Sequence, residues 1–189
     1  MGATSVEAIL AATRRVIAER GPEKLRMSAI AAAAGVSRPT LYKWFPTKQE
    51  LLSAFAAHEK QLFDARLREA IDAQRTPGRK LDAALRLVVT YLDGLMGPDP
   101  IGVDPAFALQ SLASSLGPQT TSFVRLLGDA LDAVPAVRQR HLSREEAAEL
   151  FLRVAYSHYL FPHPDPEVLL ANLRSFAGLT RRPTHTMSN

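Results

Sequence analysis

The stretch that most constrains the fold is residues 28–48, which read Ser-Ala-Ile-Ala-Ala-Ala-Ala-Gly-Val-Ser-Arg-Pro-Thr-Leu-Tyr-Lys-Trp-Phe-Pro-Thr-Lys. The alanine-rich run from Ser28 predicts a short helix that ends at Gly35, because glycine readily adopts the positive φ of a tight turn. Ser37 can accept a hydrogen bond from the first N–H groups of a second helix. Pro39 suits the first turn of that helix, where its missing N–H has no intrahelical partner to lose.

The two predicted helices have an inner and an outer side. The residues expected to pack inward are Ile30, Val36, Leu41 and Phe45, and those left facing outward are Arg38, Thr40, Tyr42 and Lys43. This layout is typical of a helix-turn-helix whose second helix enters a DNA major groove.

Capping signals flank the pair on both sides. The sequence Thr4-Ser5-Val6-Glu7 predicts a capping box that opens a helix to about Arg20, which Gly21-Pro22 ends. Thr47-Lys48-Gln49-Glu50 predicts a second capping box and a long helix to about Arg75. At 1.5 Å per residue this long helix spans roughly 40 Å, enough to connect a small head to a separate body.

The pattern over residues 5–56 resembles the tetracycline-repressor (TetR) family of bacterial regulators. The residues that carry the resemblance are Glu19-Arg20-Gly21, Ile30-Ala31, Ala34-Gly35-Val36-Ser37, Pro39-Thr40-Leu41-Tyr42, Phe45-Pro46, Lys48 and Leu51-Leu52. The resemblance implies a homodimer that binds a palindromic operator in double-stranded DNA. It also implies a body with an internal pocket for a small, mostly apolar effector, so we expect a repressor that this effector releases.

Beyond the head the chain predicts helices and almost no strands. Helices are expected over residues 79–96, 105–115, 118–134, 143–160 and 166–177, which gives an all-α fold with about nine helices in total. We expect a helix-turn-helix DNA-binding domain over residues 1–48 and an effector-binding and dimerisation domain over residues 49–179. Residues 180–189 are polar and are expected to form a disordered tail.

Charge and composition agree with this division. Residues 1–48 hold eight cations and three anions, whereas the rest of the chain sums to −1. A basic head on a neutral body is expected if only the head meets phosphate, although random scatter of surface charge also gives such counts. The absence of cysteine excludes a disulfide framework, a zinc finger and thiol catalysis.

No apolar run approaches the ~18–20 residues of a membrane span. The N-terminus lacks the pattern of a secretion signal. We therefore expect a cytoplasmic protein without membrane partners.

Eight residues are predicted to contact DNA: Ser28, Ser37, Arg38, Pro39, Thr40, Tyr42, Lys43 and Lys48. Arg38 opens the second helix and can donate two hydrogen bonds to a guanine edge, or contact a phosphate. Lys48 lies in the first turn of its helix, where a cation opposes the helix dipole, and this favours a nearby phosphate. Pro39 contacts a thymine methyl or is only a helix starter.

Two neighbouring positions complete the predicted head. Arg26 stands where relatives often carry a serine or threonine helix cap, so the cap is expected to shift to Ser28. Trp44 is expected to pack against the following helix rather than to touch DNA.

The last two predicted helices are apolar over most of their circumference and therefore need cover on two sides. They form either a central core helix with a partner in the same chain, or an interface with their copies in a second subunit. For the dimer interface we expect Leu150, Val154, Leu169, Leu173 and Phe176.

Aromatic and polar residues of the body form either an ordinary core or the lining of a ligand cavity. The candidates for the cavity are Tyr91, Phe107, Gln110, Phe123, Phe151, Tyr156, His158 and Tyr159.

Catalysis has little support in the sequence. The five histidines lack metal-ligand spacing and no nucleophile has a recognisable base partner, so we expect no enzyme, no metal and no cofactor. The alternatives are a ligand-independent regulator of the same fold, or a helical-bundle enzyme or lipid-binding module.

Overall fold

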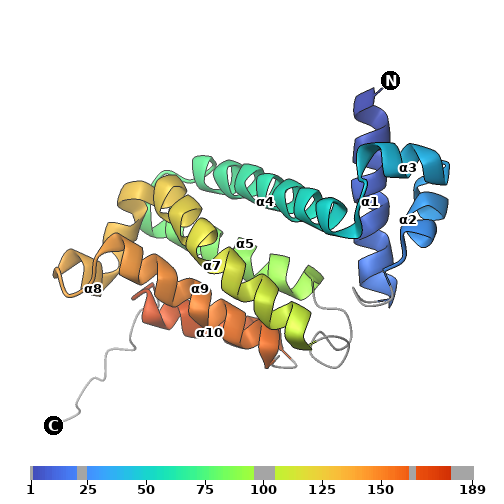
Figure 1. Cartoon of the computed structure of the whole chain (residues 1–189). Helices are drawn as coiled ribbons and strands as arrows, with labels where there is room; N and C mark the ends of the chain where they lie inside the picture. Colours follow the sequence, from blue (N-terminus) through green and yellow to red (C-terminus); the bar gives the residue numbers. More distant parts are fainter. Residues whose placement is uncertain (1, 21–24, 96–104, 162–164, 180–189) are drawn as a thin grey trace, which may run out of the picture. The chain divides into compact units, whose positions relative to one another are not determined.

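The computed structural model describes residues 2–20, 25–95, 105–161 and 165–179 of the chain. Over these residues it contains nine α-helices, one 3-10 helix and no strand, which confirms the predicted all-α fold (Figure 1). The elements are α1 (Gly2–Arg20), α2 (Met27–Ala34), α3 (Arg38–Trp44), α4 (Lys48–Asp72), α5 (Pro77–Leu95), α7 (Pro105–Leu127), η1 (Gly128–Ala133), α8 (Pro135–Arg138), α9 (Arg144–Leu160) and α10 (Pro166–Phe176). None of the helices in the described ranges combines the length and apolar character that a membrane span needs.

The helices form two compact units. Unit 1 consists of Met1–Arg66 and Gly94–Ala113, and unit 2 consists of Leu67–Asp93 and Ser114–Asn189. Helices α4, α5 and α7 therefore each contribute residues to both units.

Unit 1 has a core built from α1 to α4. Its buried residues are Ile9, Leu10, Ala12, Val16, Leu25, Ile30, Ala31, Leu41, Phe45 and Leu51, and Leu52, Ala54 and Phe55 of α4 pack against them. Thr13 is also fully buried, and its hydroxyl donates to the Ile9 carbonyl of the same helix at 2.9 Å. This bond satisfies the polar group without a partner from another helix.

The turn between α2 and α3 forms as the sequence predicts. Gly35 has φ +67°, and the N–H of Val36 donates to the Ala31 carbonyl at 3.0 Å. Ser37 caps α3 by accepting a hydrogen bond from the N–H of Thr40 at 3.2 Å. Both features can be predicted from the sequence, because each capping residue bonds a backbone group only a few positions away.

The predicted start of two helices is wrong. Helix α1 begins at Gly2, so the Thr4-Ser5-Val6-Glu7 sequence lies inside it rather than at its cap. Helix α2 begins at Met27 with Arg26 as its N-cap, and no side chain makes the cap hydrogen bond. Arginine has no acceptor to offer a free N–H, and Ser28 lies within the first turn instead.

Pro118 does not start a helix. It lies within the continuous helix α7, which spans the predicted gap between residues 115 and 118. An interior proline removes one backbone hydrogen bond, and the rest of a long helix can tolerate that loss. The helix ends at Leu127, before Gly128 with φ +52°, and the predicted segment to residue 134 continues as η1.

In unit 2, α9 and α10 lie side by side, as Figure 1 shows. The predicted capping box of α9 is confirmed, because Ser143 and Glu146 bond each other's backbone N–H at 3.0 and 2.7 Å. The rings of Phe151 and Phe176 meet edge to face with their centroids 5.4 Å apart. Arg174 of α10 donates to Asp82 of α5 at 2.5 and 3.1 Å, a bidentate ion pair that joins these two helices.

Candidate nucleic-acid interface

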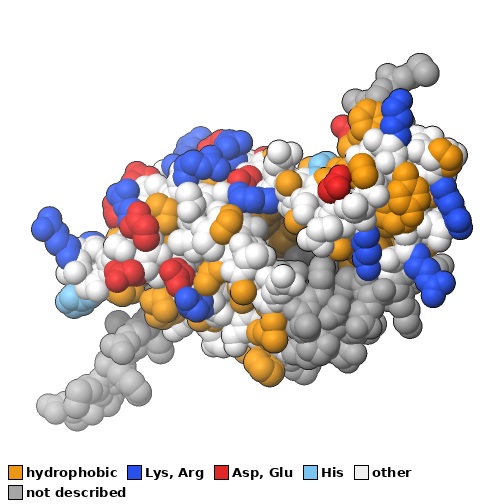
Figure 2. All heavy atoms as spheres, viewed as in Figure 1, with side chains coloured by type: hydrophobic (Ala, Val, Ile, Leu, Met, Phe, Trp, Pro, Cys, Tyr) orange, Lys and Arg blue, Asp and Glu red, His pale blue; other side chains and the backbone are white. Residues whose placement is uncertain are grey.

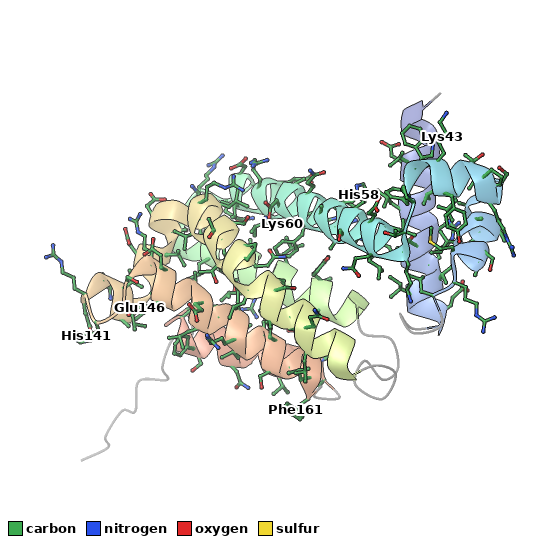
Figure 3. All side chains as sticks on the ribbon, viewed as in Figure 1. Lys43, His58, Lys60, His141, Glu146 and Phe161 are labelled. Carbon is green, nitrogen blue, oxygen red and sulfur yellow. The ribbon has the colours of Figure 1, made fainter. Side chains whose placement is uncertain are left out.

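Helix α3 is anchored on one side and open on the other. Leu41 is fully buried and Phe45, which follows the helix, is 7% exposed, so both belong to the core of unit 1. On the opposite side, Tyr42 keeps 47% of its surface exposed. Arg38 and Lys43 are exposed as well. Figure 3 shows the Lys43 side chain projecting from the outer side of α3.

None of the eight predicted DNA-contact residues is buried. Ser28 and Thr40 are half-buried, and the exposed residues are Ser37, Arg38, Pro39, Tyr42, Lys43 and Lys48. They lie on α2, at the N-cap of α3, on α3 itself and at the start of α4, all within unit 1. The part of the surface that carries α2 and α3 shows Lys and Arg side chains beside hydrophobic ones (Figure 2). Cations next to apolar groups match the chemistry of a DNA groove, which offers phosphates and thymine methyl groups.

The start of α3 is held by hydroxyl groups. The hydroxyls of Ser37 and Thr40 share a hydrogen bond of 2.8 Å, in addition to the backbone cap that Ser37 provides. Each hydroxyl carries one proton, so the hydroxyl that accepts within this pair keeps its own O–H to donate to a phosphate. Arg38, which lies between them in sequence, is thereby fixed at the first position of the helix.

The start of α4 is held in a similar way. The Thr47 hydroxyl accepts a hydrogen bond from the N–H of Glu50 and donates to its carboxylate, both at 3.1 Å. Lys48 is the first residue of the helix and is exposed. The cap fixes the backbone from which this cation extends.

Trp44 is 43% exposed, so more than half of its side chain is covered and its outer part is open to solvent. It stands beside Lys43 at the end of α3. We predicted packing against the following helix. The exposed part of the ring is an aromatic surface on the same helix as the predicted contacts.

Sequence reasoning missed two arginines of α1 that support this face. Arg14 forms a bidentate ion pair with Glu59 of α4, and Arg15 donates to the Ala33 carbonyl of α2 at 2.7 Å. The partners lie 45 and 18 positions away in sequence. No local pattern could have found them, because helical spacing rules relate residues only three or four positions apart.

The predicted pocket residues do not share one environment. Phe123, Phe151 and His158 are buried, Tyr91 and Tyr156 are half-buried, and Gln110 is exposed. The side chains of Phe107 and Tyr159 lie outside the described part of the structure. The Tyr156 hydroxyl and Ser115 share a hydrogen bond of 2.9 Å, and burial raises the pKa of this tyrosine.

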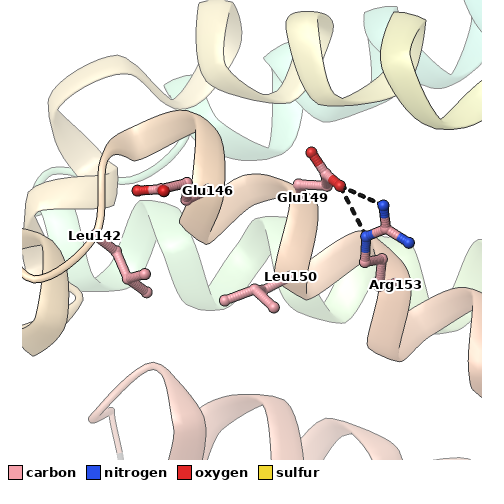
Figure 4. Close-up of a pocket in the computed structure, with 5 residues that line it drawn as sticks. All are labelled: Leu142, Glu146, Glu149, Leu150 and Arg153. Carbon is pink, nitrogen blue, oxygen red and sulfur yellow. Dashed lines mark hydrogen bonds and ion pairs between the residues drawn. The ribbon is translucent and has the colours of Figure 1, made fainter.

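A hollow of about 270 Å³ lies on the outer surface of α9 (Figure 4). It is lined by Leu142, Glu146, Glu149, Leu150 and Arg153, and the last residue pairs with Glu149 along the helix. None of the eight predicted pocket residues lines this hollow.

The predicted dimer residues fall into two groups. Leu150, Val154 and Phe176 are 37%, 41% and 48% exposed. Leu169 and Leu173 are only 5% and 1% exposed within the single chain, so their place in an interface between subunits stays a prediction. They face the core of unit 2 because the same chain covers the apolar side of α10 on which they lie.

Among the residues that the structure describes, no group of three or more His, Asp or Glu side chains could hold a metal ion.

The similarity to known proteins is clearest in the N-terminal region that contains α1 to α3. The family model described as "Bacterial regulatory proteins, tetR family" matches residues 9–55. The transcriptional repressor KstR of Mycobacterium tuberculosis is 28% identical over 178 residues, which cover 94% of this chain and 72% of that protein. KstR of Rhodococcus jostii is 32% identical over 93 residues, and the match covers 49% of this chain and about two fifths (41%) of that protein.

Solved structures extend the similarity to nearly the whole chain. The fatty acid degradation regulator FadR from Bacillus halodurans has a TM-score of 0.64 at 19% identity, covering 94% of this chain and 97% of that one. The TetR family repressor AlkX from Dietzia has a TM-score of 0.56 at 22% identity, covering 92% and 94%. At these identities the similarity establishes a shared fold.

Proposed function

Because the chain belongs to the TetR family of bacterial regulatory proteins, we propose that it binds a palindromic DNA operator as a homodimer and represses transcription. The observation that supports this best is the two-sided placement of α3. Leu41 is fully buried, whereas Arg38 and Lys43 are exposed on the same helix. A helix with this division can insert its polar side into a major groove while its apolar side stays in the core.

The contacts that we propose follow from the position of each side chain. Arg38, at the first position of α3, reads a base edge through its two-pronged guanidinium group. Lys48 and the Tyr42 hydroxyl contact the phosphate backbone, and Ser37 and Thr40 contribute their hydroxyls at the start of α3. A repressor that reads DNA in this way acts in the cytoplasm, where the bacterial chromosome lies.

The second recognition helix is proposed to come from a second subunit. The exposed Leu150 and Val154 of α9 and Phe176 of α10 supply an apolar surface on unit 2 that a copy of the chain can cover. A two-fold dimer places its recognition helices one turn of DNA apart, about 34–36 Å. The operator should therefore be palindromic.

We assign DNA binding to residues 1–48, and effector binding and dimerisation to residues 49–179. The effector is proposed to be small and mostly apolar, because the body is rich in buried aromatic side chains such as Phe123 and Phe151. Tyr156, bonded to Ser115, and the buried His158 supply a few polar groups to orient such a ligand. To release DNA, the ligand must prefer the released state, and a preference of ~100-fold corresponds to about 2.7 kcal/mol per site.

A second candidate is a regulator of the same fold that needs no ligand. The same buried side chains, Phe123 and Phe151, are equally expected in an ordinary packed core that binds no effector. A thermal-shift screen with small apolar molecules distinguishes the two, since a ligand at 100 times its dissociation constant adds about 2.7 kcal/mol of stability.

DNA binding is tested by selection from a pool of random duplexes at low salt. We expect enrichment of one two-fold symmetric sequence, with an affinity that falls steeply as salt rises. Failure to enrich any duplex would contradict the proposal and favour the helical-bundle enzyme or lipid-binding module. Sedimentation tests the dimer: Val154→Glu together with Phe176→Glu should give monomers, and an unchanged dimer would place the interface elsewhere.

A further inference from the structure

Two consecutive arginines of α1 hold two different helices of unit 1. Arg14 forms a bidentate ion pair with the carboxylate of Glu59 on α4. Its Nε donates to Oε1 at 3.2 Å and its Nη2 donates to Oε2. Arg15 donates from Nη2 to the Ala33 carbonyl of α2 at 2.7 Å. We call these four residues the arginine clamp.

Glu59 occupies a position at which an ionised carboxylate needs a partner. It is only 7% exposed, whereas the Arg14 side chain keeps 38% of its surface open. A buried carboxylate without a cation would lose its hydration and gain nothing in return. The bidentate geometry also fixes the orientation of the two groups, because both planar ends must line up.

The ion pair lengthens the attachment of α4 to α1. The α4 residues that pack on the core of unit 1 are Leu51, Leu52, Ala54 and Phe55. Glu59 follows Phe55 by one helical turn, about 6 Å along the axis. Without the pair, the apolar contacts near the start of α4 would fix its direction over a shorter length.

Arg15 acts at the other end of the recognition motif. The Ala33 carbonyl lies in the last turn of α2, where backbone carbonyls lack intrahelical donors and the helix dipole favours a cation. Helix α2 has no basic residue of its own in this turn. The bond therefore steadies the turn at Gly35, from which α3 begins.

We propose that the arginine clamp positions the recognition helix for DNA binding, by fixing the direction of α4 relative to α3. The role rests on the proposed function, because it sets the half-site spacing that a dimer can read. Glu59 and Arg14 are positioning residues, since they act through the helices that they join. A purely structural ion pair would affect stability and leave the preferred spacing unchanged.

The first test measures helix orientation without DNA. The chain contains no cysteine, so Lys43→Cys on α3 and Gln61→Cys on α4 give two unique sites for spin labels. Labelled chains are diluted with unlabelled protein so that distances within one chain dominate. Glu59→Gln should broaden the distance distribution, whereas Glu69→Gln, the same change at an exposed position of α4, should leave it as in the wild type. An unchanged distribution in Glu59→Gln would overturn the proposal.

The second test uses the palindromic duplex that the wild type selects, with one base pair inserted or removed at its centre. The wild type and Glu69→Gln should lose affinity steeply on either change. Glu59→Gln should bind the original duplex roughly tenfold more weakly, about 1.4 kcal/mol, with a smaller further loss on changed spacing. An equal loss by Glu59→Gln at every spacing would indicate a role in stability alone and reject the clamp.

Arg15→Gln provides a second variant, at an exposed position where the change leaves no buried charge without a partner. Loss of the Arg15 charge lowers the affinity for every duplex by the same factor. A weaker dependence of affinity on the half-site spacing therefore reports a loss of positioning rather than a loss of charge. If the wild type selected no duplex at all, the proposed function would fail, and the distance measurement would still decide whether the clamp fixes α4.

Discussion

Two glycines with nearly the same positive φ are predicted to respond very differently to alanine. Gly35 has φ +67° and Gly178 has φ +68°, so both occupy the left-handed region that a Cβ disfavours. A Cβ at Gly35 would meet no atom within 4 Å, whereas at Gly178 it would lie 2.6 Å from Cγ and 2.8 Å from Cδ of Pro135. The ring of Pro135 cannot rotate away, so the backbone must shift.

The conformational penalty is common to both positions. It is about 1–2 kcal/mol for the left-handed conformation, less roughly 0.5 kcal/mol because alanine lowers the entropy of the unfolded chain. Gly35→Ala should therefore cost about 1 kcal/mol. Overpacking against Pro135 adds about 1–3 kcal/mol, so Gly178→Ala should cost about 3 kcal/mol.

Urea unfolding at one fixed protein concentration measures both changes. The only tryptophan of the chain, Trp44, reports on unit 1 by fluorescence, and far-ultraviolet circular dichroism reports on all helices. Equal losses for the two variants would refute the argument, because they differ only in the atoms that surround the new methyl group.

Three further predictions concern DNA contacts, pH dependence and backbone strain. Arg38→Ala should relax the base preference at one or two operator positions by about 1–3 kcal/mol. Lys48→Ala should weaken binding to all duplexes evenly and lower the slope of log affinity against log salt concentration by about one. Gel shifts over a range of salt concentrations distinguish the two effects. The hydrogen bond and charge of Arg174 lower the pKa of Asp82, so this pair stabilises the fold above the ordinary aspartate pKa near ~4 and the benefit fades as pH falls through the lowered value. The stability difference between the wild type and Asp82→Asn should therefore shrink on acidification, and a difference that grew instead would contradict it. Arg140 has φ +61°, so Arg140→Gly should raise the free energy of unfolding by roughly 0.5 kcal/mol in urea titrations, and a destabilised variant would reject strain there.

The sequence predicted best those features that depend on a few neighbouring residues. Gly35, Ser37 and the Ser143 capping box all act within one turn, and the structure confirms each of them. The outward face of α3 follows from helical periodicity in the same way.

Features that depend on distant partners could not be predicted. The apolar pattern of α10 identifies the face that includes Leu173, but periodicity does not say whether the same chain or a second subunit covers it. The pair of Arg14 with Glu59 joins residues 45 positions apart. Pro118 shows the opposite error, since a strong local signal for a helix start was overridden by the surrounding helix.

The placement of Leu51 and Phe55 in the core of unit 1 determines how short a fragment for DNA-binding studies can be. A fragment truncated after Lys48 would remove these side chains and expose to water the part of the unit 1 core that they cover. An expression fragment that ends beyond Glu59 retains this cover together with the anion that neutralises Arg14. The minimal folding segment is therefore longer than the set of residues that we propose contact DNA.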